Sequence, residues 1–246
     1  MARIGFISDI HGNLEALGAV IGDAEFVGCD AMVCLGDVIG YGPDPGACLD
    51  LVAQNCDVMI RGNHDEAVIE ERLAARFKAR AWRSLETSKD QLEPGHLALI
   101  GSMRERGEIA GLQLAHGGFT KRRFQYLYDG EAASASLDAL KSPIGFVGHT
   151  HLPSAFIRRG DFGVVESHTL QPNTEVALPR GARVILNPGS VGQPRDRNPD
   201  ASWGVLDTDR WVFQARRVEY DIDAVTDRMR RLGLPEFHAL RLKAGV

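Results

Sequence analysis

Aspartate, asparagine and histidine residues stand directly after several short apolar runs of this sequence, and glycines flank most of them. Asp9-Ile10-His11 follows the run that begins at Ile4, and Gly36-Asp37 follows the run that begins at Ala31. Three further runs are followed by Gly-Asn-His, His-Gly and Gly-His-Thr-His. Carboxylate, amide and imidazole groups are ligands of divalent transition metals in proteins. The sequence therefore predicts a metal site from seven residues: Asp9, His11, Asp37, Asn63, His116, His149 and His151.

The Gly148-His149-Thr150-His151 stretch is the strongest single signal. With 27 glycines and 8 histidines in 246 residues, chance predicts only about 0.03 occurrences of Gly-His-x-His. An isolated Asp-x-His or Gly-Asp, in contrast, is common in ordinary turns. The prediction of a metal site therefore rests on all five stretches together, each placed after an apolar run.

The first third of the chain alternates between predicted strands and predicted helices. Asn13 has the side chain of a helix N-cap, and the helix that it starts is predicted to end near Phe26. The other predicted elements are strands at 3–8, 31–35 and 57–60 and helices at 45–54 and 65–91. This alternation is typical of a largely parallel sheet covered by helices. Ligands bind at the carboxyl ends of the strands in such sheets, which is where the candidate ligands stand.

Short strands dominate the rest of the chain. A hairpin is predicted around Gly111 over residues 108–115, followed by a basic and aromatic loop at 120–130 and a helix at 131–141. The later predictions are strands at 144–147, 155–158, 163–167, 175–178, 183–186, 203–207 and 211–217, a helix at 221–232 and a short helix after Pro235. No linker or break in composition interrupts the chain, so we predict one domain over residues 1–246 with two sheets.

Composition sets broad limits on the function. The chain has a net charge of −5 and no long basic block, which gives no support for binding to duplex nucleic acid. No apolar stretch reaches membrane-spanning length, and no cleavable leader pattern begins the sequence. The four cysteines form no Cys-x-x-Cys pair, so we predict reduced thiols and a cytoplasmic protein.

The five metal-ligand stretches resemble those of the calcineurin-like metallophosphoesterases, and the resemblance extends from Ile4 to about Asp207. The stretches GDVIGYGPDP (36–45) and NPGSVGQPRD (187–196) are similar to a bacterial and archaeal phosphodiesterase-like branch related to YfcE. The resemblance implies an α/β fold of two packed mixed β-sheets flanked by helices, a four-layer αββα sandwich. It also implies two divalent metal ions, with manganese expected first and iron, zinc, nickel or cobalt as alternatives.

The resemblance also assigns the ligands to the two ions. One ion would take Asp9, His11, Asp37 and His151, and the other would take Asp37, Asn63, His116 and His149, so that Asp37 bridges them. Two divalent ions, two carboxylates and a bridging hydroxide leave a net charge of about +1, which favours an anionic substrate. The implied reaction is hydrolysis of a phosphodiester by that hydroxide. The alternatives are a nucleotide pyrophosphohydrolase acting on dinucleoside polyphosphates, a phosphomonoesterase, and a scaffold that has lost the reaction.

His64 follows the candidate ligand Asn63, and the resemblance implies a catalytic role for it. It would protonate the leaving group or stabilise the transition state as a cation, whereas the structural alternative is a histidine that caps the next helix. Phosphoprotein phosphatases of this superfamily carry Gly-Asp-x-x-Asp, whose second aspartate orients the histidine. Gly40 stands at that position here, and Asp65 and Asp44 are the candidates to replace the missing carboxylate.

Three residues are candidate contacts for a small phosphorylated substrate, which we expect to be a nucleotide or a similar phosphoester. They are Asn13, Arg61 and Arg122. Asn13 is equally suited to cap a helix, and Arg61 to form a surface salt bridge. The loop FTKRRFQYLYD (119–129) offers cations for phosphates and rings for a base, or it forms a solvated turn. The turn at 187–190 is expected beneath the site, and the oligomeric state stays open.

Overall fold

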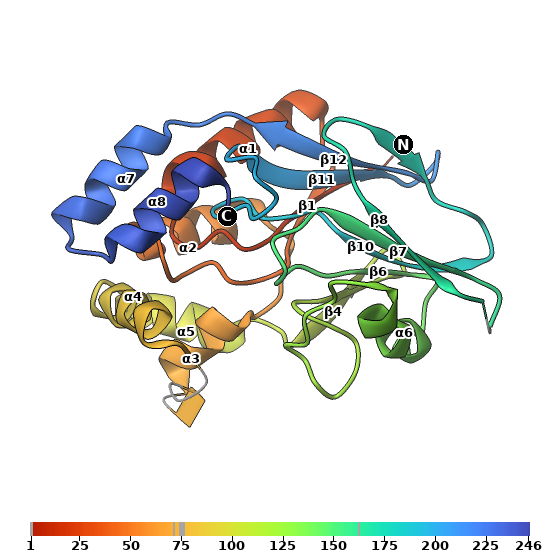
Figure 1. Ribbon diagram of the computed structural model, residues 1–246, viewed down its shortest axis with the longest axis horizontal. Coiled ribbons are helices and arrows are strands. Elements are labelled where there is room, and N and C mark those ends of the chain that lie inside the picture. Colours follow the sequence, from red (N-terminus) through yellow and green to blue (C-terminus); the bar gives the residue numbers. More distant parts are fainter. Residues whose placement is uncertain (1, 71, 74–76, 162) are drawn as a thin grey trace.

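Two six-stranded mixed β-sheets pack face to face, with helices on their outer sides (Figure 1). The computed structural model describes residues 2–70, 72, 73, 77–161 and 163–246. The predicted four-layer α/β sandwich is thereby confirmed. The helical stretch predicted over 65–91 includes residues 71 and 74–76, which lie outside the described residues.

The first sheet combines three parallel strands with three antiparallel ones. Its order is β3 (Val58–Met59), β2 (Ala31–Cys34), β1 (Arg3–Ile7), β11 (Ala201–Asp207), β12 (Val212–Val218) and β9 (Glu175–Ala177). β1, β2 and β3 are parallel, and β11 joins β1 in the antiparallel direction. Helices α1 (Leu14–Val27) and α2 (Pro45–Asn55) make the two parallel connections. The carboxyl ends of β1, β2 and β3 therefore meet at one edge of the sheet.

The second sheet has the same mixed character. Its order is β4 (Arg106–Ile109), β5 (Leu112–Ala115), β6 (Ile144–Phe146), β10 (Ala182–Asn187), β7 (Ser154–Arg159) and β8 (Val165–Thr169). β5, β6 and β10 are parallel to one another. Helix α6 (Gly130–Ala139) covers the outer side of this sheet, as Figure 1 shows. The carboxyl ends of β5 and β6 thus also meet at one edge.

The core between the sheets is built from the inward side chains of both. Phe6 of β1 and Phe146 of β6 stack with their ring centroids 3.6 Å apart and their planes 3° apart. Val33 and Leu114 are fully buried in the same cluster. Complete burial of such a side chain stabilises a fold by roughly 1.5–3 kcal/mol relative to its exposure. The stacking of Phe6 on Phe146 fixes the position of one sheet relative to the other.

The remaining helices gather at one end of the molecule, on the left in Figure 1. They are α3 (Asn63–Ile69), α4 (Ala79–Asp90), α5 (Pro94–Ser102), α7 (Ile222–Arg231) and α8 (Glu236–Ala244). Among the described residues, no helix combines the length and the apolar character needed to cross a membrane.

Local sequence explains most of the element boundaries. Asn13 caps α1 as predicted, because its side chain accepts a hydrogen bond from the backbone N–H of Ala16 at 3.2 Å. Gly28 ends the same helix with a φ of 74°, a conformation that glycine adopts without steric cost. Two differences from the prediction concern helices. The stretch at 65–91 is divided between α3 and α4, and α5 lies where no helix was predicted.

Candidate metal centre and substrate cavity

The seven candidate ligands lie together at the edge where the parallel strands of both sheets end. β1, β2 and β3 deliver four of them and β5 and β6 deliver three, in the order Asp9, His11, Asp37, Asn63, His116, His149 and His151. Six are buried, and Asn63 is half-buried. The prediction that five strand ends converge agrees with the observed sheet order.

Five of these residues have a left-handed backbone conformation. The φ angle is 54° at Asp9, 51° at His11, 54° at Asp37, 67° at His149 and 62° at His151. Residues with a Cβ atom reach this region at a cost of roughly 1–2 kcal/mol each. Such strain is concentrated at functional sites, where the surrounding structure holds it. This backbone conformation costs local stability, and it sets the direction in which these five side chains point.

One group of ligand atoms is formed by Asp9, His11 and His151. Oδ1 of Asp9 lies 3.3 Å from Nε2 of His151 and 4.0 Å from Nε2 of His11. This oxygen is buried and has no hydrogen-bond partner among the described residues, whereas Oδ2 accepts the backbone N–H of His149 at 2.9 Å. One carboxylate oxygen is thus held by the backbone, and the other faces the two imidazoles.

A second group is formed by Asp37, His116 and His149. Oδ2 of Asp37 lies 3.3 Å from Nε2 of His116, which in turn lies 3.1 Å from Nδ1 of His149. The same Oδ2 is 3.9 Å from Nε2 of His11 in the first group. Oδ1 of Asp37 instead accepts the backbone N–H of His64 at 2.8 Å. Asp37 therefore presents one oxygen to both groups.

Asn63, which lines the same cavity as His149, adds a neutral oxygen donor to the site. Its Oδ1 is buried without a hydrogen-bond partner in the described part of the chain. Burying an unpaired amide oxygen costs free energy unless a partner of another kind satisfies it. A cation is such a partner, because an amide oxygen ligates divalent ions.

The orientation of the imidazoles also fits a cation. Nδ1 of His11 lies 3.0 Å from the carbonyl oxygen of Ile39, and Nδ1 of His151 lies 2.6 Å from that of Gln193. A carbonyl oxygen can only accept, so in both neutral rings Nδ1 carries the hydrogen and Nε2 a lone pair. The two Nε2 atoms face each other at 3.3 Å. A positive charge between them removes their repulsion, so the residues fit a divalent metal ion.

Burial and mutual charge perturb the titration of these groups in opposite directions. Burial raises the pKa of Asp9 to about 6 and lowers the pKa of His149 to about 3. Burial opposes ionisation of Asp37 as well, but the charges of His116, His64 and His11 and a hydrogen bond from His116 together outweigh it and hold the pKa of Asp37 well below its usual range. Burial also opposes protonation of His116, yet Asp37 raises its pKa to about 9. Such divergent pKa values mark candidate functional sites.

His64 stands beside the ligands with its ring held by aromatic contacts. Its centroid lies 4.8 Å from that of His11, 4.7 Å from that of Tyr41 and 4.9 Å from that of Phe77. Nδ1 of His64 is buried and has no hydrogen-bond partner among the described residues. A Cβ atom on Gly40 would lie 2.5 Å from that nitrogen. The glycine at the family's aspartate position therefore leaves room for the ring instead of orienting it.

The structure corrects the expectation that Asp65 or Asp44 orients His64. Both carboxylate oxygens of Asp65 accept backbone N–H groups, those of Gly62, Asp37, Val38 and Ile39. Asp44 instead receives hydrogen bonds from the guanidinium of Arg228 at 2.7 and 3.1 Å. Asp65 thus holds the turns that carry Asp37 and Asn63, and packing positions His64.

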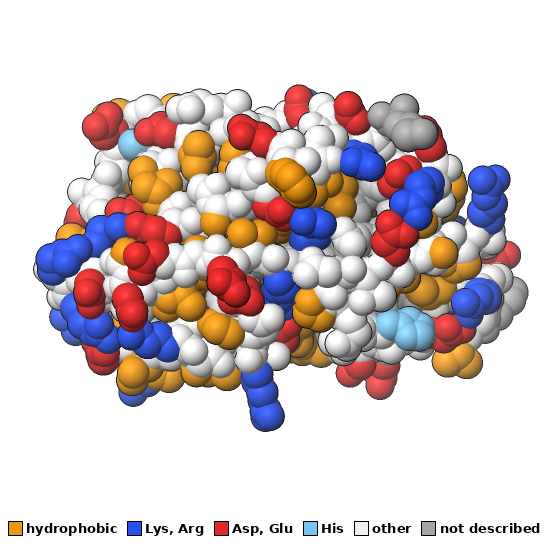
Figure 2. Space-filling model, turned by 90° about the horizontal axis from the view of Figure 1, so that it is seen from above, with side chains coloured by type: hydrophobic (Ala, Val, Ile, Leu, Met, Phe, Trp, Pro, Cys, Tyr) orange, Lys and Arg blue, Asp and Glu red, His pale blue; other side chains and the backbone are white. Residues whose placement is uncertain are grey.

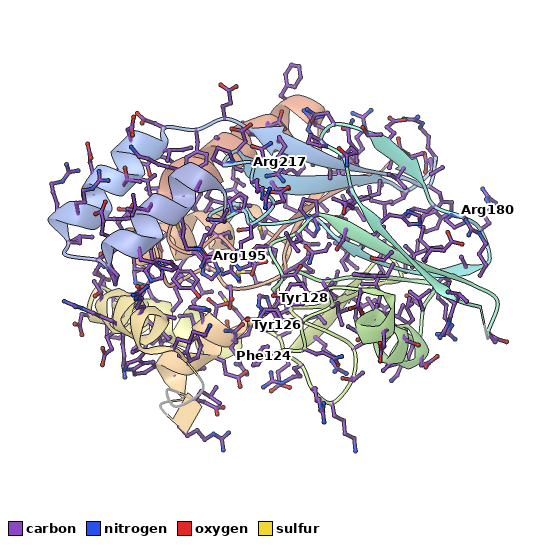
Figure 3. The ribbon with its side chains drawn as sticks, in the orientation of Figure 1. Phe124, Tyr126, Tyr128, Arg180, Arg195 and Arg217 are labelled. Atoms are coloured by element: carbon purple, nitrogen blue, oxygen red, sulfur yellow. The ribbon has the colours of Figure 1, made fainter. Side chains whose placement is uncertain are left out.

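A cavity of about 440 Å³ lies above the candidate ligands. Asn63, His64 and His149 form part of its lining. Its other charged and aromatic lining residues are Tyr41, Phe77, Lys78, Phe124, Tyr126, Arg195 and Arg241. Figure 3 shows Arg195, Phe124, Tyr126 and Tyr128 gathered near the middle of the molecule. An anion in this cavity would meet three cationic side chains as well as any bound metal.

Two tyrosines continue outward from the ligand His149. Tyr126 stacks on the His149 ring with centroids 3.9 Å apart, and Tyr128 stacks on Tyr126 at 5.3 Å with the ring planes 2° apart. Tyr126 and Tyr128 are exposed, at 44% and 55% of their surface. The aromatic side chains of the 119–129 loop are therefore not all tucked into the core, since Tyr126 covers a candidate ligand.

Asn13 is placed in the framework of the site. Its Nδ2 donates to the carbonyl oxygen of Gly192 at 3.0 Å, and its Oδ1 accepts the N–H of Ala16. The side chain is fully buried. Asn13 thus connects the start of α1 to the loop that carries Arg195, and both ends of its amide are occupied by these contacts.

Arg61 and Arg122 do not line the cavity. The guanidinium of Arg61 lies 3.6 Å from carboxylate oxygens of Glu66 and of Glu105, and it donates to the carbonyl oxygen of Gly101 at 3.3 Å. Arg122 is exposed on the loop. Both expected substrate contacts therefore have other surroundings in the structure.

Sequence reasoning missed all three cationic lining residues, Lys78, Arg195 and Arg241. Arg195 belongs to the NPGSVGQPRD stretch, of which residues 187–190 were predicted as a turn beneath the site, and Arg241 lies on α8 near the end of the chain. Asn187 and Ser190 do support the site from below. Asn187 donates to the carbonyl oxygen of Gly148 at 2.7 Å, and the Ser190 hydroxyl donates to the carbonyl oxygen of Asp9 at 2.7 Å. No local pattern marks an arginine that reaches a site from so distant a segment.

Comparisons with known proteins agree with this geometry. The family model described as "Calcineurin-like phosphoesterase" matches residues 2–154. The chain is 30% identical to protein MJ0912 of Methanocaldococcus jannaschii, over 99% of this chain and 98% of the relative. It is 29% identical to phosphodiesterase YfcE of Escherichia coli K12, over 85% of this chain and 89% of the relative.

Solved structures show the same similarity. The crystal structure of a metallophosphoesterase from Sphaerobacter thermophilus is 36% identical and superposes with a TM-score of 0.87, covering 100% of this chain and 99% of that one. Protein PH1004 of Pyrococcus horikoshii superposes with a TM-score of 0.79 at 18% identity, again over 100% of this chain and 99% of that one. The second similarity concerns the fold alone.

Proposed function

The chain belongs to the calcineurin-like phosphoesterase family and is a metal-dependent phosphoester hydrolase, and on this premise we propose that it is a binuclear-metal phosphodiesterase. The phosphodiesterase YfcE, to which it is similar over most of its length, supports the choice of a diester. The proposed substrate is a small phosphorylated molecule. The proposed compartment is the cytoplasm, supported by the unpaired thiols of its four cysteines.

The residues that would hold the ions follow the two groups of ligand atoms. One ion would be held by Asp9, His11, Asp37 and His151, and the other by Asp37, Asn63, His116 and His149. When bound, two divalent ions polarise the phosphoryl group and lower the pKa of a water molecule. Manganese is our first choice, with iron, zinc, nickel and cobalt as alternatives, because all suit a mixed nitrogen and oxygen ligand set.

The position of Asp37 is the observation that carries the proposal. Its Oδ2 is 3.3 Å from Nε2 of His116 and 3.9 Å from Nε2 of His11, so a single oxygen faces both groups. The backbone N–H of His64 holds the other oxygen. A single-metal hydrolase has no need of a carboxylate placed between two sets of imidazoles, since three protein ligands suffice for a catalytic zinc.

We propose that His64 protonates the leaving group of the diester. Its ring lines the cavity beside Asn63. Burial lowers the pKa of His64 to about 4, although the charge of Asp37 acts in the opposite direction. The neutral ring becomes a proton donor only when further negative charge raises that pKa. A bound phosphate supplies such charge, so substrate binding itself would prepare the proton for the departing alkoxide.

We propose that the guanidinium of Arg195 binds the non-reacting oxygens of the phosphate. Its guanidinium lines the cavity, and it donates to Oε1 of Gln193 at 2.9 Å while pairing with no described carboxylate. The pyrophosphohydrolase alternative instead expected Lys121, Arg122 and Arg123 at the substrate. All three lie outside the cavity lining, and Arg123 pairs with Glu66, which removes that support.

The experiment that tests the proposal measures metal content and turnover on one preparation. We expect about two ions per chain by mass spectrometry and Mn²⁺-dependent hydrolysis of bis(p-nitrophenyl) phosphate. Asp37→Asn should lose both, whereas Asp90→Asn, on the exposed end of α4, should retain both. Full metal content and full activity in Asp37→Asn would refute the binuclear centre. Two ions without any turnover would favour the non-catalytic scaffold.

A further inference from the structure

A second cavity adjoins the one above the candidate metal centre. It has a volume of about 470 Å³, and the two cavities share the lining residues Tyr41, Lys78, Ala81 and Arg241. Arg80 and Phe237 line only the outer cavity. The two cavities are therefore neighbours, and we refer to them together as the hollow, which extends from the candidate metal ligands toward α8.

The cations of this hollow form no ion pair with an aspartate or glutamate among the described residues. They are Lys78, Arg80, Arg195 and Arg241. Arg241 donates its Nε to an oxygen of Val246, the last residue of the sequence. Burial and the nearby charge of Arg195 lower the pKa of Arg241. Unpaired positive charges that repel each other are stabilised by an anion placed between them.

Two arginines near the site show the opposite arrangement. Arg123 forms two hydrogen bonds of 2.8 Å with the carboxylate of Glu66, and Arg228 pairs with Asp44 and Glu15. Figure 2 shows the face above α7 and α8 with Lys and Arg side chains interspersed among Asp and Glu. The cavity cations differ from Arg123 and Arg228 in having no described aspartate or glutamate beside them.

An aromatic ring stands among these cations. The guanidinium of Arg80 lies 4.9 Å from the ring centroid of Phe237, and that of Arg241 lies 5.5 Å from it. Phe237 is 44% exposed, so one part of its ring is open to a ligand. The outer cavity thus offers two guanidinium groups in contact with one aromatic ring and an apolar surface, which suits a phosphate attached to a flat or apolar group.

We propose that the outer cavity is a subsite for a second phosphate, so that the substrate is a small molecule with one phosphate at the metal centre and another at Arg80 and Arg241. This inference rests on the proposed function for the identity of the reacting site. It assigns Lys78, Arg80 and Arg241 to binding and specificity, and it gives them no part in the bond that breaks. A nucleoside bisphosphate ester is the simplest molecule of this class.

Two esters with the same leaving group test the proposal. They are the p-nitrophenyl ester of thymidine 5′-phosphate and the same ester with an additional 3′-phosphate. In the manganese-loaded protein we expect kcat/KM to be about tenfold higher for the 3′-phosphorylated ester, through a lower KM, because charge-assisted hydrogen bonds have about this worth. Arg80→Gln should bring the ratio near one. Arg180→Gln, at the opposite end of the molecule in Figure 3, should keep it.

A binding measurement without metal separates the two proposals. Calorimetry in EDTA should show thymidine 3′,5′-bisphosphate binding about tenfold more tightly than thymidine 5′-phosphate, with the difference lost in Arg80→Gln. Equal affinities in the wild-type protein, or an unchanged difference in Arg80→Gln, would overturn the second-phosphate subsite. Absence of bis(p-nitrophenyl) phosphate turnover with the affinity difference intact would refute the phosphodiesterase and leave the subsite standing.

Discussion

The carboxylate of Asp37 occupies the space that a side chain on residue 62 would need. A Cβ atom added to Gly62 would lie 2.1 Å from Oδ1 of Asp37 and 2.4 Å from its backbone nitrogen. We therefore expect Gly62→Ala to displace Asp37, to lower the metal content to less than half and to abolish turnover. Metal analysis by mass spectrometry and the bis(p-nitrophenyl) phosphate assay measure both effects.

A second glycine provides the matched control for that substitution. A Cβ atom on Gly101, in α5, would meet no atom within 4 Å. Gly101→Ala should keep metal and activity and stabilise the helix by about 0.5–1 kcal/mol. If Gly62→Ala binds two ions as tightly as Gly101→Ala does, the close contact does not fix Asp37.

The role assigned to His64 depends on the leaving group. His64→Ala should keep the metal content, since the side chain is not among the proposed ligands, and should slow alkyl diesters by about 100-fold or more. Diesters of p-nitrophenol should lose much less, because that leaving group departs without a proton. Steady-state rates for a methyl and a p-nitrophenyl diester measure the difference. His168→Ala, on an exposed position of β8, is the control. An equal loss of rate for both esters would rule out His64 as the general acid.

Arg195 should affect the affinity and the rate for every phosphate substrate. Removing a charge-assisted hydrogen bond costs roughly 1.5–3 kcal/mol, so Arg195→Met should lower kcat/KM about 10- to 100-fold. Metal content should stay unchanged because the guanidinium is not a ligand. Arg180→Met, in a cavity far from the metal ligands, should have no effect. Wild-type kinetics in Arg195→Met would show that the guanidinium does not contact the phosphate.

The stability of the protein should fall in mild acid partly through His238. Its ring centroid lies 4.7 Å from that of Tyr41, with the ring planes tilted by 43°, and its Nε2 lies 3.4 Å from the carbonyl oxygen of Arg80. Burial, and then the charges of Arg241 and Arg195, lower the pKa of His238 to about 4. The unfolded chain, with a pKa near 6.5 for this group, binds more protons between these values. The contribution of His238 to the free energy of unfolding is therefore fully present above pH 6.5 and is lost as the pH falls toward 4.

Urea unfolding in EDTA at pH 5.0 and 7.5 measures this contribution. His238→Gln should reduce the loss of unfolding free energy between the two pH values by on the order of 1 kcal/mol, because glutamine does not titrate. At pH 7.5 the amide can still donate to Arg80. An identical pH dependence in variant and wild type would mean that His238 is protonated equally in the folded and the unfolded chain.

The predictable parts of this structure are those with local causes. Asn13 caps α1 as expected, and Gly111 lies in the predicted hairpin, because capping and turn chemistry act over a few residues. α5 was missed for the same reason. Its nine residues begin with Pro94 and include Gly95 and Gly101, which lower helix propensity. Burial of Ile100 against the core provides the compensation, and this contact is not visible in the local sequence.

The same division applies to the site. The expected ligands stand at strand ends, so the alternation of elements is enough to bring them to one edge. Asp65 was considered only as a partner of His64, and the structure gives it four backbone N–H groups instead. Arg195 and Arg241 reach the cavity through tertiary folding of the last quarter of the chain. Their contribution depends on where α8 packs, and side-chain types alone do not determine that.

Each of the two groups of candidate ligands takes members from both sheets. Asp9 and His11 extend from the first sheet toward His151 of the second, and Asp37 faces His116 and His149 in the same way. Filled with ions, the centre would fasten the sheets together at two points, and the stack of Phe6 on Phe146 would set the gap that the ions must bridge. A substitution of Phe6 or Phe146 would then weaken metal binding, and the variant would lose its metal on dialysis. A screen of variants for metal retention would therefore identify the core residues that set the distance between the sheets as well as the residues that ligate the ions.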